Sequence, residues 1–148
     1  MWVNLYILLI FAGFVCLAQY LVARAGWHYF FVKGDEFAVK SGVRVKHVSG
    51  SIHKASYYQS FTIWASKDGI SVGPRYPGQC FHYLGFASYK YLTNACIVKE
   101  MVEDVLELSF QRNNIKAKFL IPLNKEGRKV IPLVKRVVNV KRRWCKKE

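Results

Sequence analysis

The segment FTIWASKDGISV, residues 61–72, reads as a β-hairpin. Phe61, Ile63 and Ala65 alternate with residues that can face water, which is the period of a strand with one buried side. The turn that follows ends in Gly69, a residue free to adopt positive φ, and residues 70–72 continue as a return strand. The segment therefore predicts two antiparallel strands that neighbour each other in a sheet.

A second hairpin is predicted further along the chain. Residues 106–110 and 115–119 alternate cleanly, and Asn113 and Asn114 between them tolerate the left-handed backbone of a tight turn. Between the two hairpins, residues 73–78 hold two Pro and two Gly, which predict a loop. Further strands are predicted at 43–48, with Val43 and Val45 on one face, and at 81–91 and 95–102.

The C-terminal part of the chain has the pattern of an amphipathic helix. Asn124 can cap this helix, and Pro132 indicates that it begins late or bends near that position. Apolar residues recur at helical spacing, at Val130, Ile131, Leu133, Val134, Val137 and Val138. Strands followed by one such helix predict a mainly β fold, in which a bent sheet or barrel is closed by the C-terminal helix.

The N-terminal residues 1–23 carry no charged side chain. A helix over this stretch measures about 35 Å, enough to cross a hydrocarbon core about 30 Å thick. We therefore predict one transmembrane helix, with Trp2, Tyr6, Tyr20 and Trp27 toward its ends at headgroup level. The predicted organisation is a transmembrane helix at 1–25, a juxtamembrane linker at 26–35, a β domain with its C-terminal helix at 36–140 and a basic tail at 141–148.

Two other interpretations of the apolar stretch stay open. A cleavable signal peptide would use Ala23-Arg24-Ala25 as its small-residue site, although no Lys or Arg precedes the apolar run. A buried helix of a soluble domain is the second. For a membrane span, the positive-inside rule predicts an outer N-terminus and a cytoplasmic domain at a bacterial inner membrane. The basic residues behind that prediction are Arg24, Lys33, Lys40, Arg44 and Lys46.

The order of elements resembles the pleckstrin-homology (PH) and GRAM superfamily, in which seven strands form a strongly bent barrel closed by a C-terminal helix. More narrowly, residues 61–72, the Pro-containing loop and the segment Phe86-Ala87-Ser88-Tyr89 are similar to bacterial PH-like proteins. In those proteins an x-D-G-L turn is followed by a stretch of the form h-P-W-S-x-I, whereas here Ala87 and Tyr89 stand in the region of the Pro and Trp. The resemblance covers about residues 36–140 and implies a binding or scaffolding module.

The formal charge of +14 is concentrated near the C-terminus, where residues 125–148 hold ten Lys or Arg against Glu126 and Glu148. Basic side chains beside a bilayer attract anionic headgroups, and Trp favours the interface. We therefore predict contact with the membrane or an acidic partner, and not with nucleic acid. The residues concerned are Lys141, Arg142, Arg143, Trp144, Lys146 and Lys147, and simple solvation of a frayed helix end is the alternative.

Two smaller groups complete the candidate contact residues. A basic group on the early strands is a candidate site for an anionic headgroup, with an ordinary solvated strand face as the alternative; it comprises Lys40, Arg44, Lys46 and Lys54. Polar or small residues within the apolar stretch suit contact with a neighbouring transmembrane helix. They are Asn4, Ala12, Gly13 and Gln19.

Neither a catalytic site nor a metal or cofactor site is predicted. Residues 51–54 match S-x-x-K, but the companion motifs of penicillin-binding enzymes are absent. The four His lack metal-ligand spacing, and the chain has no Gly-rich phosphate loop. The four Cys form no close pair, so we expect Cys80 and Cys96 to be buried small hydrophobes. The redox compartment stays open, and cytoplasmic placement would suit unpaired cysteines.

Together these patterns predict a membrane-anchored, non-catalytic binding or scaffolding module that engages a protein partner or an anionic membrane surface. Two alternatives stay open, an accessory subunit of a larger integral membrane complex and a membrane-anchored immunity or inhibitor protein. An apolar content of 52% excludes a disordered basic chain, which lacks the apolar surface needed to offset the entropy of ordering.

Overall fold

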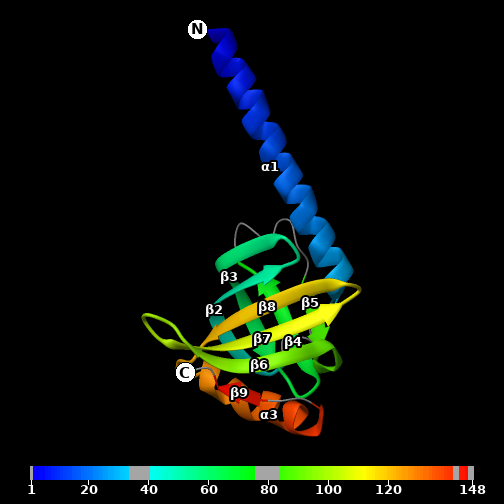
Figure 1. Cartoon of the computed structure of the whole chain (residues 1–148), viewed down its shortest axis with the longest axis vertical. Helices are drawn as coiled ribbons and strands as arrows, with labels where there is room; N and C mark the ends of the chain where they lie inside the picture. The colour runs from blue at the N-terminus through cyan, green and yellow to red at the C-terminus, as the bar shows by residue number, and fades with distance from the viewer. Residues whose placement is uncertain (1, 34–40, 76–83, 142–143, 147–148) are drawn as a thin grey trace.

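A long helix precedes a curled antiparallel sheet, and a short helix follows the sheet (Figure 1). The structure is a computed structural model that describes residues 2–33, 41–75, 84–141 and 144–146, of which 29, 33, 139–141 and 144–146 are described by their backbone alone. The helices are α1 (Trp2–Phe30) and α3 (Val130–Lys141), with 3-10 turns η2 (Tyr89–Tyr91) and η3 (Gly127–Lys129). The strands are β1 (Val32–Lys33), β2 (Val43–Ile52), β3 (Ala55–Ala65), β4 (Gly69–Pro74), β5 (Gly85–Ser88), β6 (Leu92–Lys99), β7 (Asp104–Arg112), β8 (Ile115–Pro122) and β9 (Trp144–Lys146). The mainly β fold class with a closing C-terminal helix is thereby confirmed.

The sheet consists of two groups of consecutive strands that share one junction. Its order is β1-β5-β4-β3-β2-β8-β7-β6-β9. The seven strands from β2 to β8 pair with one another in antiparallel fashion, whereas β9 pairs with β6 in parallel. Strand β2 pairs with β3 on one side and with β8 on the other, so it joins the group β2 to β5 to the group β6 to β8. The sheet curls about this junction into a half-barrel (Figure 1).

Both predicted hairpins are confirmed. Strands β3 and β4 pair with Ile63 opposite Val72, and the amide of Ser66 donates to the carbonyl of Gly69 at 2.9 Å to close the turn. Strands β7 and β8 pair along their whole length, and the φ angles of Asn113 and Asn114 are 51° and 62°. Asn supplies this left-handed turn because its short polar side chain tolerates positive φ.

Other strand boundaries differ from those predicted. Strand β2 contains a bulge at His47, whose φ is 61°, so Val45 and Val48 both face inward although they lie three residues apart. The segment predicted as a strand at 81–91 is described from residue 84, and its end forms η2 because the Ser88 hydroxyl accepts from the amide of Lys90 at 3.4 Å. Strand β6 ends at Lys99, before the predicted boundary at 102.

The C-terminal helix begins late, as Pro132 predicts. The side-chain oxygen of Asn124 accepts from the amides of Glu126 at 3.1 Å and Gly127 at 2.9 Å, and the chain first forms η3. The α-helix then starts at Val130 and carries Pro132 in its first turn, where the missing N–H costs no helical hydrogen bond. Helix α3 buries Val130, Val134 and Val138 and lies at the end of the sheet farthest from the N-terminus of α1 (Figure 1).

The core is aromatic at the end of the sheet that α1 enters. The Trp27 ring lies 5.7 Å from Phe61, Phe30 lies 6.2 Å from Phe110 and Phe31 lies 6.1 Å from Phe119, measured between ring centres. Strand β5 approaches this cluster through Gly85, where any Cβ would come within 2.5–2.8 Å of Phe31. Glycine is therefore needed at position 85 to let the strand lie against the ring.

Candidate functional site

The end of α1 is part of the domain core. Trp27 exposes 0% of its surface, Phe30 1% and Phe31 3%, whereas the helix from Trp2 to Ala25 is exposed or only partly covered. The predicted linker at 26–35 therefore begins with three core aromatic residues, and the helix continues to Phe30 instead of ending at 25. These residues join the core because their rings are large. An aromatic side chain stabilises the fold far more when it is buried than when it is exposed to water in a linker.

Arg112 links the C-terminal end of α1 to the sheet. Its Nη1 donates to the carbonyl of Phe30 at 3.1 Å, and its guanidinium lies 5.0 Å from the centre of the Tyr91 ring. Carbonyls in the last turn of a helix lack intrahelical partners and carry partial negative charge, which favours a cation there. Arg112, at the end of β7, thus places a positive charge at the point where α1 meets the sheet.

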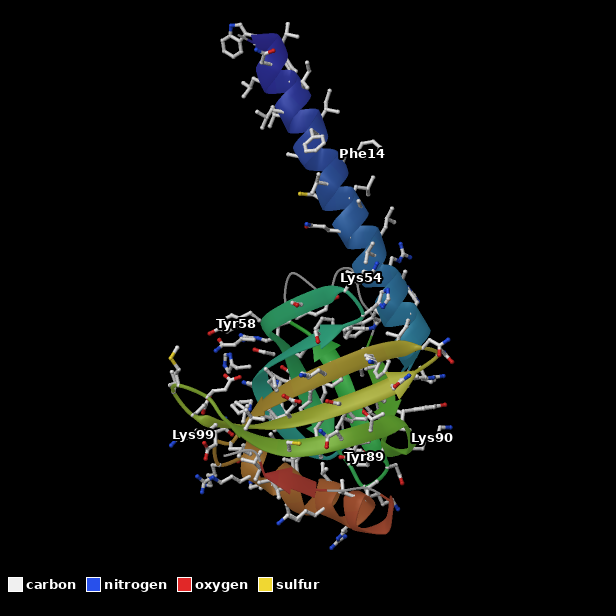
Figure 2. All side chains as sticks on the ribbon, in the orientation of Figure 1. Phe14, Lys54, Tyr58, Tyr89, Lys90 and Lys99 are labelled. Carbon is white, nitrogen blue, oxygen red and sulfur yellow. The ribbon has the colours of Figure 1, made fainter. Side chains whose placement is uncertain are left out.

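A cavity of about 780 Å³ lies between α1 and the β2–β3 hairpin, and we call it the helix slot. Near the slot, Gly26 of α1 lies close to the hairpin, and a Cβ added there would be in van der Waals contact with His53 at 3.4 Å. Figure 2 shows Lys54 at the hairpin end, beside the lower part of α1. The slot is lined by Cys16, Ala18, Gln19, Tyr20, Val22 and Ala23 of α1 and by Lys54, Ala55, Ser56 and Tyr57 of the hairpin. Burial raises the pKa of the Tyr57 phenol.

A second cavity, about 600 Å³, lies between the bulged part of β2–β3 and the β6–β7 hairpin, and we call it the hairpin groove. Among the described residues outside α1, the most exposed large hydrophobic side chains are Met101, Val102 and Tyr58, and all three line this groove. Figure 2 shows Tyr58 and Lys99 on the same side of the domain. The other lining residues are His47, Ser49, Gln59, Lys99, Glu100, Glu103, Val105, Leu120 and Pro122.

The wall of the hairpin groove formed by β2 and β3 has irregular backbone. Gln59 has a φ of 46°, and its amide donates to the Ser49 hydroxyl at 2.8 Å. Nη1 of Arg75 lies 2.7 Å from Nδ1 of His47. Because a guanidinium only donates, Nδ1 of His47 is the acceptor and Nε2 carries the ring proton. Bulges and left-handed non-Gly residues are features that proteins concentrate next to binding sites.

The predicted headgroup residues do not form one site. Arg44 lies at the start of β2 with its guanidinium 5.9 Å from the centre of the Trp64 ring, and Lys54 lies beyond the other end of that strand. Lys46 is exposed between them, close to the bulge. Lys40 lies outside the described residues. Among the three described members of the set, Lys54 alone borders the helix slot.

The described backbone of the basic tail lies far from the N-terminus of α1. Lys141 ends α3, and the β9 backbone runs parallel to β6 with Trp144 opposite Ala95 and Lys146 opposite Ile97. Helix α3 and strand β9 lie at the opposite end of the domain from α1 (Figure 1). Arg142, Arg143 and Lys147 lie outside the described residues. Contact of the tail with the membrane or an acidic partner stays a prediction.

The predicted helix-contact residues of α1 divide between two faces. At 3.6 residues per turn, Asn4, Ala12 and Gln19 fall on one side of the helix and Gly13 falls on another. All four are exposed, and no atom within 4 Å would meet a Cβ at Gly13. Gln19 lines the helix slot, so its face continues into that cavity.

Cys16 and Cys96 differ in burial and in bonding. Cys96 is buried, as expected, but it is disulfide-bonded, while Cys16 is exposed with a free thiol. The β9 backbone places Cys145 in register with Cys96. Cys80 lies outside the described residues. The sequence gives no spacing signal for this bond, because pairing here depends on strands that are distant along the chain.

The sequence did not indicate the hairpin groove, since residues 99–102 were expected to continue a strand. The one available signal is that two apolar residues, Met101 and Val102, lie between Glu100 and Glu103. Within the described part of the chain, no group of His, Cys, Asp or Glu is arranged to hold a metal ion. No protein-family model and no curated protein matches the chain.

Proposed function

We propose that the chain is a single-span, membrane-anchored, non-catalytic module that holds a protein-binding surface at a fixed position above a bilayer. Helix α1 is long and apolar enough to cross a membrane, and its spanning window has no buried residue. A signal sequence would satisfy the same test of length and composition. The observation that carries the proposal is that the same helix ends inside the domain core at Trp27 and Phe30, which restricts hinge motion between anchor and domain.

The hairpin groove is the surface we assign to the partner. Apolar side chains that protrude together from a water-facing surface are typical of interaction sites, because their burial in a complex is favourable. Met101, Val102 and Tyr58 supply the apolar contacts, and Glu100, Glu103 and Lys99 form a charged rim. Tethering raises the effective concentration of such a surface for partners in the same membrane.

The resemblance to PH-like domains supports a binding role. Seven antiparallel strands that curl and end in a helix agree with the architecture that the resemblance implies. A PH-like assignment would make the β domain a recognition module, and we include that assignment in the proposal.

We place the domain in the cytoplasm of a bacterium, on the basis of the Lys and Arg that follow α1. The disulfide at Cys96 is the observation that opposes this orientation, because disulfides persist in oxidising compartments. Alkylation of the free thiols in acid-quenched cells distinguishes a cytoplasmic domain from one in an oxidising compartment. Reaction of all four cysteines would support the cytoplasmic placement, whereas protection of one pair would contradict it and place the domain on the oxidising side.

Photocrosslinking of the full chain in its native membranes tests the partner surface. A benzophenone amino acid at Met101 is compared with the same probe at Gln111, which is exposed at the β7–β8 hairpin and is not part of the groove. We expect one discrete product from position 101 that disappears when Val102→Asp places a charge in the apolar tip. Equal products from both positions, or a product that survives Val102→Asp, would contradict the proposal.

A further inference from the structure

We propose that the helix slot binds one anionic phospholipid, with its phosphate against Lys54 and an acyl chain along α1. This inference rests on the proposed function in one respect, that α1 crosses a bilayer. It adds a ligand site that is distinct from the hairpin groove.

The depth of the slot follows from helix geometry. From Trp2 to Ala23 the helix rises about 32 Å, which matches a hydrocarbon core about 30 Å thick. Arg24, the first charged residue of the chain, then lies at the near headgroup level. The slot borders α1 between Cys16 and Ala23, so it lies in the near leaflet and opens toward the headgroups. At this depth the slot is surrounded by lipid and not by water.

The two walls of the slot differ in polarity. Most of the α1 wall is small or apolar, with Cys16, Ala18, Val22 and Ala23 along which a hydrocarbon chain can lie, and Gln19 and Tyr20 add two polar groups to it. The hairpin wall presents Ser56 and the exposed ammonium of Lys54, which can donate to a phosphate. An occupant must therefore be apolar on one side and polar at one end, as a phospholipid is.

The charge of the slot favours an anionic headgroup. Lys54 is the one Lys or Arg among the described residues that line it, and no Asp or Glu among them offsets that charge. One Lys near a membrane surface favours an anionic lipid by about fivefold. We therefore expect selectivity for phosphatidylglycerol over phosphatidylcholine, which share their acyl chains and differ in net charge.

The test measures lipid selectivity of the full chain. The protein is reconstituted into vesicles of equal parts phosphatidylglycerol and phosphatidylcholine, and a spin-labelled form of each lipid reports the fraction immobilised by the protein. We expect about fivefold preference for the phosphatidylglycerol label. Lys54→Ala is expected to abolish the preference, and Lys67→Ala, which removes an exposed Lys from the β3–β4 turn at the other end of the domain, is expected to keep it.

A second variant tests the cavity itself. Ser56→Trp fills the slot from the hairpin side and is expected to reduce immobilisation of both labels. Three results would overturn the inference: equal preference in wild type and Lys54→Ala, displacement of the lipid by excess inorganic phosphate, or a stable dimer whose second helix fills the slot. Carbonate extraction of the same vesicles tests the membrane anchor separately from the lipid site. Release of the wild-type chain from the vesicles would refute the anchor. Retention of the chain without lipid selectivity would refute only the lipid site.

Discussion

Trp2 and Trp27 lie near the two ends of α1 and have opposite surroundings. Trp2 exposes 70% of its surface, whereas Trp27 exposes none and its ring lies 5.7 Å from that of Phe61. The apolar side chains of the first part of the helix are not covered by protein, so this part is suited to the lipid of a membrane and not to water. The last part needs no membrane, because the sheet itself buries it. One helix thus serves as anchor and as core element.

The largest effect is expected from two truncations that separate these parts. Deletion of residues 1–24 keeps Trp27, Phe30 and Phe31, so the domain should fold and remain in solution. Deletion of residues 1–31 removes all three rings, and each is worth about 3–5 kcal/mol against a typical stability of about 5–15 kcal/mol. We expect this shorter chain to lack near-ultraviolet circular dichroism and to aggregate. Folding of both chains to the same extent would show that the helix end is dispensable.

The next largest effect compares the two tryptophans directly. Trp27→Ala is expected to lower the free energy of unfolding of the domain by about 3–5 kcal/mol, because it leaves a cavity among buried rings. Trp2→Ala is the matched control and should leave that free energy unchanged. Urea unfolding in detergent micelles measures both. Similar losses in the two variants would mean that the exposed part of α1 also supports the fold.

A charge in the exposed part of α1 should act on the membrane and not on the domain. Phe14 exposes 72% of its surface near the middle of the apolar stretch (Figure 2). Phe14→Asp is expected to disfavour insertion by about 3 kcal/mol, which lowers the carbonate-resistant fraction. The urea midpoint of the domain should stay the same, with Phe14→Leu as the control for insertion. A change in that midpoint would link the two parts of the helix energetically.

The smallest effect is expected at the end of the core near α3. Tyr89 exposes 3%, and its hydroxyl has no hydrogen-bond partner among the described residues. Burial raises the pKa of this phenol, so the folded state keeps a proton that the unfolded state loses above about pH 10. The free energy of unfolding therefore falls as pH rises through that range.

Tyr89→Phe should remove this part of the alkaline destabilisation and change stability at neutral pH by less than about 1 kcal/mol. Urea midpoints at neutral pH and above pH 10 measure the effect. Tyr58→Phe is the control, since Tyr58 exposes 81% of its surface. An alkaline loss of stability that is identical in wild type and Tyr89→Phe would show that other groups cause it.

Local patterns predicted much of the fold. Alternation at residues 61–72, the Asn pair at 113–114 and the capping residue Asn124 each specify a short-range structure, and all three are confirmed. Patterns of this kind are readable because a turn or a cap depends on residues that are close along the chain. The candidate sites were less predictable, since Lys54 and Arg44 looked like one group in the sequence and lie at opposite ends of β2.

The sequence by itself determined that the chain combines an uncharged helix with a mainly β domain, because hydrophobic period and charge are properties of short segments. Only the tertiary structure decided that Trp27 and Phe30 belong to the core, that the β2–β3 hairpin lies beside α1 and that Cys96 is bonded. These features depend on which distant segments meet. That choice is made by the pairing of strands and the burial of large rings, neither of which leaves a local signature in the order of residues.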